Sequence, residues 1–216
     1  MYSTRDVVVQ FCMDFQLGKK LFETLYSGIN GYTISSEARS KIARVDKAYT
    51  YGEVVAESFY QMIHRMSPKK GEVFYDLGSG TGKAIILASL FFEFSKCIGI
   101  EILEDLHKIS KELLARFHHE TASVLTKDPS IVDFVNADFL QYDFTDGDIF
   151  FIHATCFPDE LMDKLTKKLR LLKKGARIIM VTKTLESASF REIDHSDEEM
   201  GWGKATIYFY EKTLSL

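Results

Sequence analysis

The chain has 216 residues, 46% of them hydrophobic, and its formal net charge at pH 7 is −4. This length suits one α/β domain with a small extension, and the hydrophobic content, which includes 17 phenylalanines, is sufficient for a complete core. The net negative charge argues against attraction of the whole surface to nucleic acid, and we expect no direct binding of nucleic acid.

Cysteine content and hydropathy exclude two further classes of protein. The three cysteines form neither an even set nor a CxxC pair, so we expect no disulfide framework. The longest apolar stretch has nine residues, which is too short to cross a bilayer, and the first residues lack the apolar segment of a signal peptide. We therefore expect a soluble intracellular protein, cytoplasmic or nuclear.

The first part of the chain predicts helices. Residues 4–26 place apolar side chains at helical spacing, residues 35–47 do so more weakly, and Gly28 and Gly31 separate the two. We interpret residues 1–48 as a helical N-terminal extension that packs on a main domain of residues 49–216.

A loop with the sequence Tyr51-Gly52-Glu53 opens the main domain, and a helix follows it to about Met66. A glycine between an aromatic residue and an acid ahead of a helix is compatible with a simple turn whose acid favours the helix N-terminus. Because the loop also precedes the glycine-rich strand directly, it is equally compatible with a loop that covers a ligand.

Residues 74–83, with the sequence FYDLGSGTGK, form the central motif. A predicted strand over residues 73–75 turns into an apolar helix over residues 84–92 through three glycines, and such a bend brings backbone N–H groups close to a ligand. A P-loop is excluded because Leu77 and Ala84 stand where that motif needs a glycine and a hydroxyl residue. The dinucleotide-binding motif is excluded because the glycines follow GxGxG spacing instead of GxGxxG. The three glycines are Gly78, Gly80 and Gly82.

Asp76 lies two residues before the first of these glycines. A carboxylate at that position would repel a phosphate, so a ligand with an ammonium group and no phosphate fits better. S-adenosyl-L-methionine is such a ligand, and DxGxGxG is similar to the pattern by which seven-stranded methyltransferases bind it. The alternative is a glycine-rich turn in an α/β protein that binds no such ligand.

Two further acids follow predicted strands, and parallel strands place such residues at one edge of a sheet. Glu101 ends the strand of residues 96–100, where an ionised carboxylate could accept hydrogen bonds from both hydroxyls of a ribose. Asp138 and Phe139 follow the strand of residues 131–135, and they offer an acceptor for an adenine amino group and a stacking face.

The remaining segments complete a predicted seven-stranded α/β sheet of Rossmann-like type whose last strand is antiparallel. His118 and His119 are neighbours on a helix, where adjacent side chains point about 100° apart, so no metal site is expected. His153 ends the fourth strand, either as a base or as a residue that supports others, and we favour the second. The predicted elements are helices over 104–125 and 159–172 and strands over 148–153, 176–181, 188–194 and 204–212. An acidic loop over 194–203 joins the last two strands, and its charge would attract a cationic methyl acceptor.

Five segments together resemble the disruptor-of-telomeric-silencing family, the histone-lysine methyltransferases without a SET domain. The resemblance covers residues 49–212, and the loop around Tyr51 is its most diagnostic part. The segments are Tyr51-Gly52-Glu53 followed by FYQMI, FYDLGSGTGK, Gly99-Ile100-Glu101, Ala137-Asp138-Phe139-Leu140, and KKGARIIMVTK.

The resemblance implies an S-adenosylmethionine-dependent methyltransferase that acts on a lysine of a protein, with a histone as a possible partner. It implies that a narrow aromatic channel desolvates the lysine amine and favours its neutral form. No general base is assigned. The methionine portion would be held by Tyr51, Glu53 and Asp76, above Gly78, Gly80 and Gly82. The ribose would be bound by Glu101, and the adenine by Asp138 and Phe139. The candidates for the acceptor channel are His153, Phe157, Trp202 and Tyr208.

Three departures from the family bear on the substrate. His153-Ala154 stands where the resemblance implies paired asparagines, and Val54 stands where it implies a threonine. We also expect no strongly basic tail, since the sequence reaches Leu216 without a run of Lys or Arg. Two alternatives to a histone enzyme therefore stay open: a methyltransferase for a small molecule or another nucleophile, and a domain that binds the cofactor without catalysis.

Overall fold

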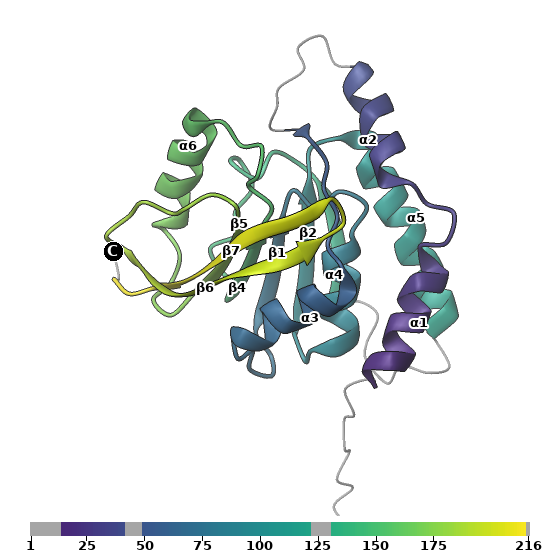
Figure 1. Ribbon diagram of the computed structural model, residues 1–216, viewed down its shortest axis with the longest axis horizontal. Coiled ribbons are helices and arrows are strands. Elements are labelled where there is room, and N and C mark those ends of the chain that lie inside the picture. Colours follow the sequence, from purple (N-terminus) through teal and green to yellow (C-terminus); the bar gives the residue numbers. More distant parts are fainter. Residues whose placement is uncertain (1–13, 42–48, 122–130, 215–216) are drawn as a thin grey trace, which may run out of the picture.

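A single mixed sheet of seven strands forms the centre of the computed structural model, which describes residues 14–41, 49–121 and 131–214 (Figure 1). The strand order is β3-β2-β1-β4-β5-β7-β6. The strands are β1 (Val73–Leu77), β2 (Lys96–Glu101), β3 (Val132–Asn136), β4 (Ile149–Ile152), β5 (Arg177–Val181), β6 (Phe190–Met200) and β7 (Gly203–Lys212).

The strand directions confirm the predicted fold class. Neighbouring strands among β1 to β5 pair in parallel, whereas β7 pairs antiparallel with both β5 and β6. The chain order reverses direction between β1 and β4, which makes this position a topological switch point. In open α/β sheets, ligands bind in the crevice beyond the carboxyl ends of the strands at such a point.

Helices cover both faces of the sheet. One hydrophobic core joins helices α1, α3, α4 and α5 to one face, and a second core joins α6 to the other. Helix α4 is buried at eight of its nine positions, which explains why its sequence is apolar without helical periodicity. The helices are α1 (Phe15–Leu25), α2 (Gly31–Ser40), α3 (Ala56–Arg65), α4 (Lys83–Phe91), α5 (Glu104–Thr121) and α6 (Asp159–Leu169).

The N-terminal helices lie against the main domain, with α1 and α2 beside α5 in Figure 1. Helix α2 begins at Gly31 and not near residue 35, because the Asn30 side chain caps it by accepting a hydrogen bond from the Thr33 N–H. Residues 4–13, 42–47 and 122–125 of the expected helices lie outside the described residues, and the domain boundary after residue 48 stays a prediction.

The expected loop over residues 194–203 is wrong. Strand β6 continues to Met200 and pairs with β7 along its whole length, so that Gly201 and Trp202 alone form the turn. The acids of this segment are compatible with a strand because β6 is the edge of the sheet, where charged side chains reach solvent. The buried alternate residues of β7, such as Ile207 and Phe209, fix the register.

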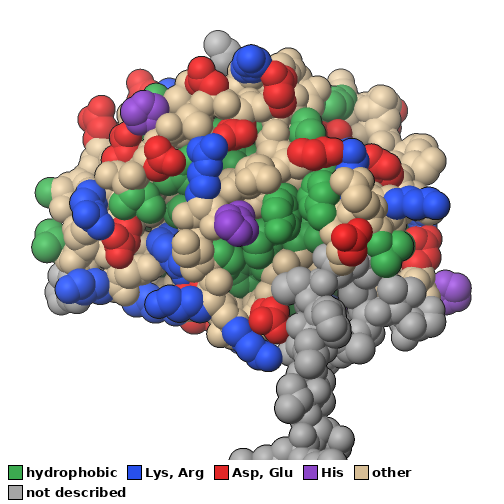
Figure 2. All heavy atoms as spheres, turned by 60° about the horizontal axis from the view of Figure 1, so that its bottom comes forward, with side chains coloured by type: hydrophobic (Ala, Val, Ile, Leu, Met, Phe, Trp, Pro, Cys, Tyr) green, Lys and Arg blue, Asp and Glu red, His purple; other side chains and the backbone are tan. Residues whose placement is uncertain are grey.

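The surface shows no face of one charge in the view of Figure 2, where acidic and basic side chains are interspersed around a central group of hydrophobic side chains. No helix within the described ranges combines the length and the apolar character that a membrane span requires.

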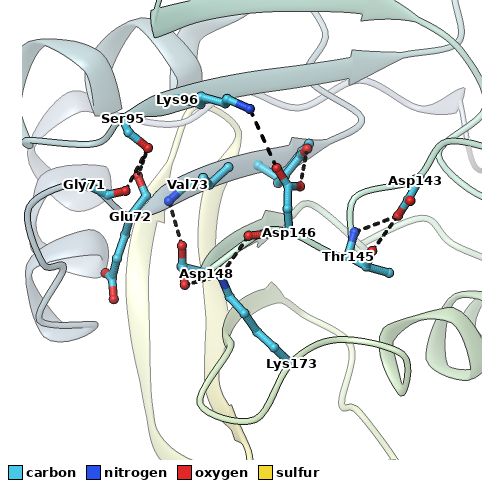
Figure 3. A network of polar contacts seen from close by, with 11 residues as sticks. Gly71, Glu72, Val73, Ser95, Lys96, Asp143, Thr145, Asp146, Asp148 and Lys173 are labelled. Atoms are coloured by element: carbon cyan, nitrogen blue, oxygen red, sulfur yellow. Dashed lines mark hydrogen bonds and ion pairs between the residues drawn. The ribbon is translucent and has the colours of Figure 1, made fainter.

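A polar network joins the amino ends of β1 and β4, opposite the ligand-binding edge (Figure 3). The Asp148 carboxylate accepts a hydrogen bond of 2.9 Å from the Val73 N–H and lies 2.5 Å from the Lys173 ammonium. The same ammonium donates to the Asp146 carbonyl, and the Asp146 carboxylate accepts from the Tyr75 hydroxyl. These bonds hold in register the two strands that flank the switch point.

We expect Asp148→Ala to lower the free energy of unfolding by about 1–3 kcal/mol, because the Val73 N–H loses its partner. Urea denaturation measures this change. Asp143→Ala is the matched control, since Asp143 accepts hydrogen bonds from Thr145 within its own exposed turn, and its loss should be clearly smaller. Equal losses in the two variants would show that the network does not stabilise the sheet.

Candidate active site

Two adjoining cavities lie at the carboxyl ends of the central strands. The larger cavity has a volume of about 280 Å³ and the smaller about 30 Å³. They share four lining residues, which mark their junction: Tyr51, Gly52, Gly78 and His153.

The larger cavity combines a flat aromatic pair with carboxylates, among them those of Asp138 and Glu101. The rings of Phe139 and Phe157 stack with centroids 5.8 Å apart and an interplanar angle of 26°. Asp138 lines the same cavity, and its carboxylate accepts a hydrogen bond of 2.8 Å from the Leu140 N–H. An apolar stacking surface beside a fixed acceptor suits a purine base.

Glu101 lies at the end of β2 in the same cavity and is held by the backbone. One carboxylate oxygen accepts from the Gly80 N–H at 2.8 Å and the other from the Leu103 N–H at 2.7 Å. Burial raises the pKa of Glu101, and these backbone hydrogen bonds oppose that shift. Each oxygen retains a further lone pair, so the carboxylate is oriented and can still accept from a ligand hydroxyl.

The smaller cavity holds three buried polar atoms without a hydrogen-bond partner among the described residues: Asp76 Oδ1, Ser79 Oγ and His153 Nε2. Burial, and second the neighbouring Glu101, raise the pKa of Asp76 well above its ordinary value. A buried carboxylate that lacks a partner is costly. A cationic ligand group in this cavity would supply the missing partner, which fits the ammonium of S-adenosylmethionine.

The loop around Tyr51 is tied to the glycine bend by a polar network. The Tyr51 hydroxyl donates to Glu53 at 3.0 Å and lies 2.8 Å from the Thr81 hydroxyl. The other Glu53 oxygen lies 2.6 Å from the Lys83 ammonium. The Tyr26 hydroxyl of the N-terminal region donates to the Thr81 carbonyl. Tyr51, Gly52 and Glu53 of this loop line the smaller cavity, and the interpretation that the loop covers a ligand stays a prediction.

The predicted glycines divide into two groups. Gly78 lines both cavities, whereas Gly80 and Gly82 line neither. A Cβ atom would lie 2.4 Å from the Tyr51 ring at Gly80 and 2.3 Å from the Phe134 ring at Gly82. These two glycines allow the close packing of the bend, and the Gly80 N–H holds Glu101.

The acceptor-channel candidates do not form one group. His153 and Trp202 lie together, with ring centroids 4.5 Å apart at 75°. Phe157 instead stacks on Phe139 in the larger cavity. Tyr208 lines neither cavity and lies beside Tyr210 on β7. Burial lowers the pKa of His153 to about 4, so its imidazole is neutral at physiological pH.

Two lysines of the site were not predicted. Lys83 lines the smaller cavity. The sequence indicated it only by its position, since it is the first residue of the helix that follows the glycines. Lys168 on α6 donates to the carbonyls of Phe139 and Leu140 at 2.8 and 2.9 Å and to that of Tyr142. It thereby holds the loop that carries Asp138. No local signal marks Lys168, because it is 29 residues from the Phe139 carbonyl that it holds.

We expect Asp76→Asn to stabilise the free protein at about pH 8, because it removes a buried charge without a partner. The folded-state pKa of Asp76 is raised, so the stability that its proton contributes is present at low pH and is lost as pH rises through that pKa. The gain should be on the order of 1–2 kcal/mol at about pH 8 and smaller at about pH 5, as measured by urea denaturation. A variant less stable than the natural protein at the higher pH would contradict this account.

Comparison of the sequence with known proteins identifies the family of the chain. Residues 32–207 match the family model described as "Histone methylation protein DOT1". The chain is 28% identical over 166 residues to a histone-lysine N-methyltransferase, H3 lysine-79 specific, of Dictyostelium discoideum, covering 74% of this chain and 9% of that protein. The protein of the same description in Caenorhabditis elegans is 26% identical over 187 residues, covering 76% and 20%.

The solved structure of TrmN from Thermus thermophilus resembles the fold, with a TM-score of 0.57, 16% identity, and coverage of 82% of this chain and 52% of that one. The chain spans between about a tenth and a fifth of the length of the two curated relatives. Since the family model matches most of its residues, the chain belongs to the DOT1 histone methylation protein family.

Proposed function

We propose that the chain is an S-adenosylmethionine-dependent methyltransferase that transfers a methyl group to a lysine amine of a protein, with a histone as its substrate. The observation that carries this proposal is the buried Asp76 carboxylate at a glycine bend, whose Oδ1 has no hydrogen-bond partner among the described residues, next to a cavity with the features of an adenosine site. Membership of the DOT1 family supports the lysine acceptor.

The two cavities divide the cofactor between them in this proposal. Asp76 and Glu53 supply negative charge for the methionine ammonium, and Lys83 supplies positive charge for its carboxylate. Glu101 accepts from the ribose hydroxyls, and Asp138 and Phe139 bind the adenine. When bound, the cofactor supplies a methyl group that is already activated by its sulfonium. The protein therefore contributes mainly alignment of the reacting groups.

The acceptor lysine has to be neutral in order to react. Its ordinary pKa of about 10.4 leaves it protonated at neutral pH. The junction of the cavities is lined by Tyr51 and His153, and the Trp202 ring packs on the latter. Burial of the amine there disfavours the charged form and exposes its lone pair.

The histone is proposed from the family, and a nuclear location would follow from it. Both relatives carry the description H3 lysine-79 specific. The exposed edge strand β6 adds a physical reason, because its acids extend toward the turn that holds Trp202 and would attract a basic protein. These acids are Glu192, Asp194, Asp197, Glu198 and Glu199. Two of them pair with Arg65 and one pairs with Lys204, so Glu192 and Asp197 are the acids of this strand that no Lys or Arg of the described residues neutralises.

Incubation with tritium-labelled S-adenosylmethionine tests the proposal. Recombinant nucleosomes, free core histones and a cell lysate are offered in parallel, and label on a histone band is the expected result. Label that appears only in small molecules would indicate a small-molecule methyltransferase. Cofactor binding without transfer to any of them would indicate a non-catalytic domain, and calorimetry that shows uptake of NAD but not of adenosylhomocysteine would remove the cofactor assignment itself.

We expect Asp76→Asn to weaken adenosylhomocysteine binding about 10- to 100-fold, because the methionine ammonium loses a charge-assisted partner. Affinity for the natural protein should fall as pH is lowered through the raised pKa of Asp76, whereas that of the variant should not follow this trend. Isothermal titration calorimetry measures both. Asp159→Asn is the control, since the Asp159 side chain is 97% exposed and lines neither cavity. Unchanged affinity in Asp76→Asn would exclude Asp76 from the site.

A further inference from the structure

We propose that His153 is the residue that orients the nucleophile: its neutral imidazole accepts, through Nε2, a hydrogen bond from the N–H of the incoming amine. This inference rests on the proposed methyltransferase function and adds a catalytic residue to it.

His153 lies where the reacting atoms would meet. It follows the last residue of β4 and lines both the larger and the smaller cavity. In S-adenosylmethionine, the sulfur that carries the methyl group joins the methionine portion to the adenosine portion. If these portions occupy the smaller and the larger cavity respectively, the sulfur and its methyl group lie at the junction, beside His153.

The Nε2 atom is buried and has no hydrogen-bond partner among the described residues. Gly52 and Trp202 enclose it: a Cβ atom at Gly52 would lie 2.7 Å from Nε2 and 2.8 Å from the Trp202 ring. A buried ring nitrogen without a hydrogen-bond partner is costly in either tautomer. A donor that enters with the substrate would recover this cost, and the route to it passes Trp202, which is 39% exposed.

The surroundings keep this imidazole neutral and available as an acceptor. The titratable groups of the smaller cavity that it faces are Glu53, Asp76, Lys83 and Tyr51, and no ion pair joins any of them to His153 in the described part of the chain. Burial lowers its pKa to about 4. A neutral ring does not repel a sulfonium, and so weak a base does not remove the proton of an ammonium whose pKa is about 10.4. His153 therefore acts by position and not as a general base.

This role of His153 limits the number of methyl groups that are transferred efficiently to one amine. The amine nitrogen bonds to the methyl carbon as the carbon–sulfur bond breaks with its electron pair on sulfur, and the methylammonium product then loses its extra proton to water. A neutral primary amine has two N–H groups, a monomethylated amine has one, and a dimethylated amine has none. The hydrogen bond to Nε2 is thus available for the first two transfers and absent from the third.

Two variants at position 153 test the role. His153→Phe keeps a ring against Trp202 but removes the acceptor, whereas His153→Asn keeps an acceptor in its amide oxygen. With nucleosomes as the probe, we expect His153→Phe to slow the first transfer about 10- to 100-fold, and His153→Asn to retain most of the rate. The third transfer should be the slowest in the natural protein and should change least in His153→Phe. Equal losses in both variants, or a full rate in His153→Phe, would overturn the proposal.

Nitrogen-15 NMR of the imidazoles gives a readout that does not depend on turnover. We expect His153 to stay neutral between about pH 5.5 and pH 9, with Nε2 unprotonated. With adenosylhomocysteine present, n-butylamine at high pH should shift the Nε2 resonance, and His153→Asn assigns the signal. Titration of His153 near its ordinary pKa, or no shift with amine, would overturn the inference. Failure of the proposed function appears separately, as loss of adenosylhomocysteine binding or of transfer in the natural protein.

Discussion

Asp76 is 3% exposed, lies near Glu101, which is 6% exposed, and has no partner for Oδ1 among the described residues. Burial, and second the charge of Glu101, make an ionised Asp76 costly, and a cation beside Asp76 would offset that cost. The bend around Gly78 and Gly80 keeps this position free of side chains, and its backbone engages Glu101 instead of Asp76. The site is therefore prepared for positive charge before any ligand arrives.

The rest of the site is assembled from segments that are far apart in the sequence. The loop around Tyr51 is held from below by Thr81 and Lys83 and from the side by β6, since Val54 pairs with Met200 and the Gly201 N–H donates to the Glu53 carbonyl. A change in the loop would therefore move both the cover of the smaller cavity and the turn that carries Trp202. The proposed cofactor and acceptor positions are therefore linked through one short segment.

The sequence was sufficient for features that depend on local order. The seven strands and the acids near the ends of β1 and β2 follow from apolar runs separated by helices and turns, and from parallel pairing. It was insufficient where distance in the chain is large. The Glu53–Lys83 pair and the hold of Lys168 on the Phe139 carbonyl span about 30 residues. The second half of β6, residues 195–200, was predicted as a loop because exposed acids resemble a loop when the partner strand is unknown.

Acidic residues lie at both ends of the parallel strands, but their surroundings differ. At the amino ends, Asp148 pairs with Lys173, and Glu72 pairs with Arg177, which also donates to backbone carbonyls after α3. At the carboxyl end of the same strand β1, Asp76 is more deeply buried and has no such cation. The fold places basic residues against the acids at the amino ends of the strands. The lack of such a partner for Asp76 at the carboxyl end therefore does not mean that this fold tolerates buried charge in general. The paired acids at the amino ends stabilise the fold, whereas the acid at the carboxyl end lowers stability until a cation binds beside it. Such a loss of stability in exchange for binding is expected of an active site.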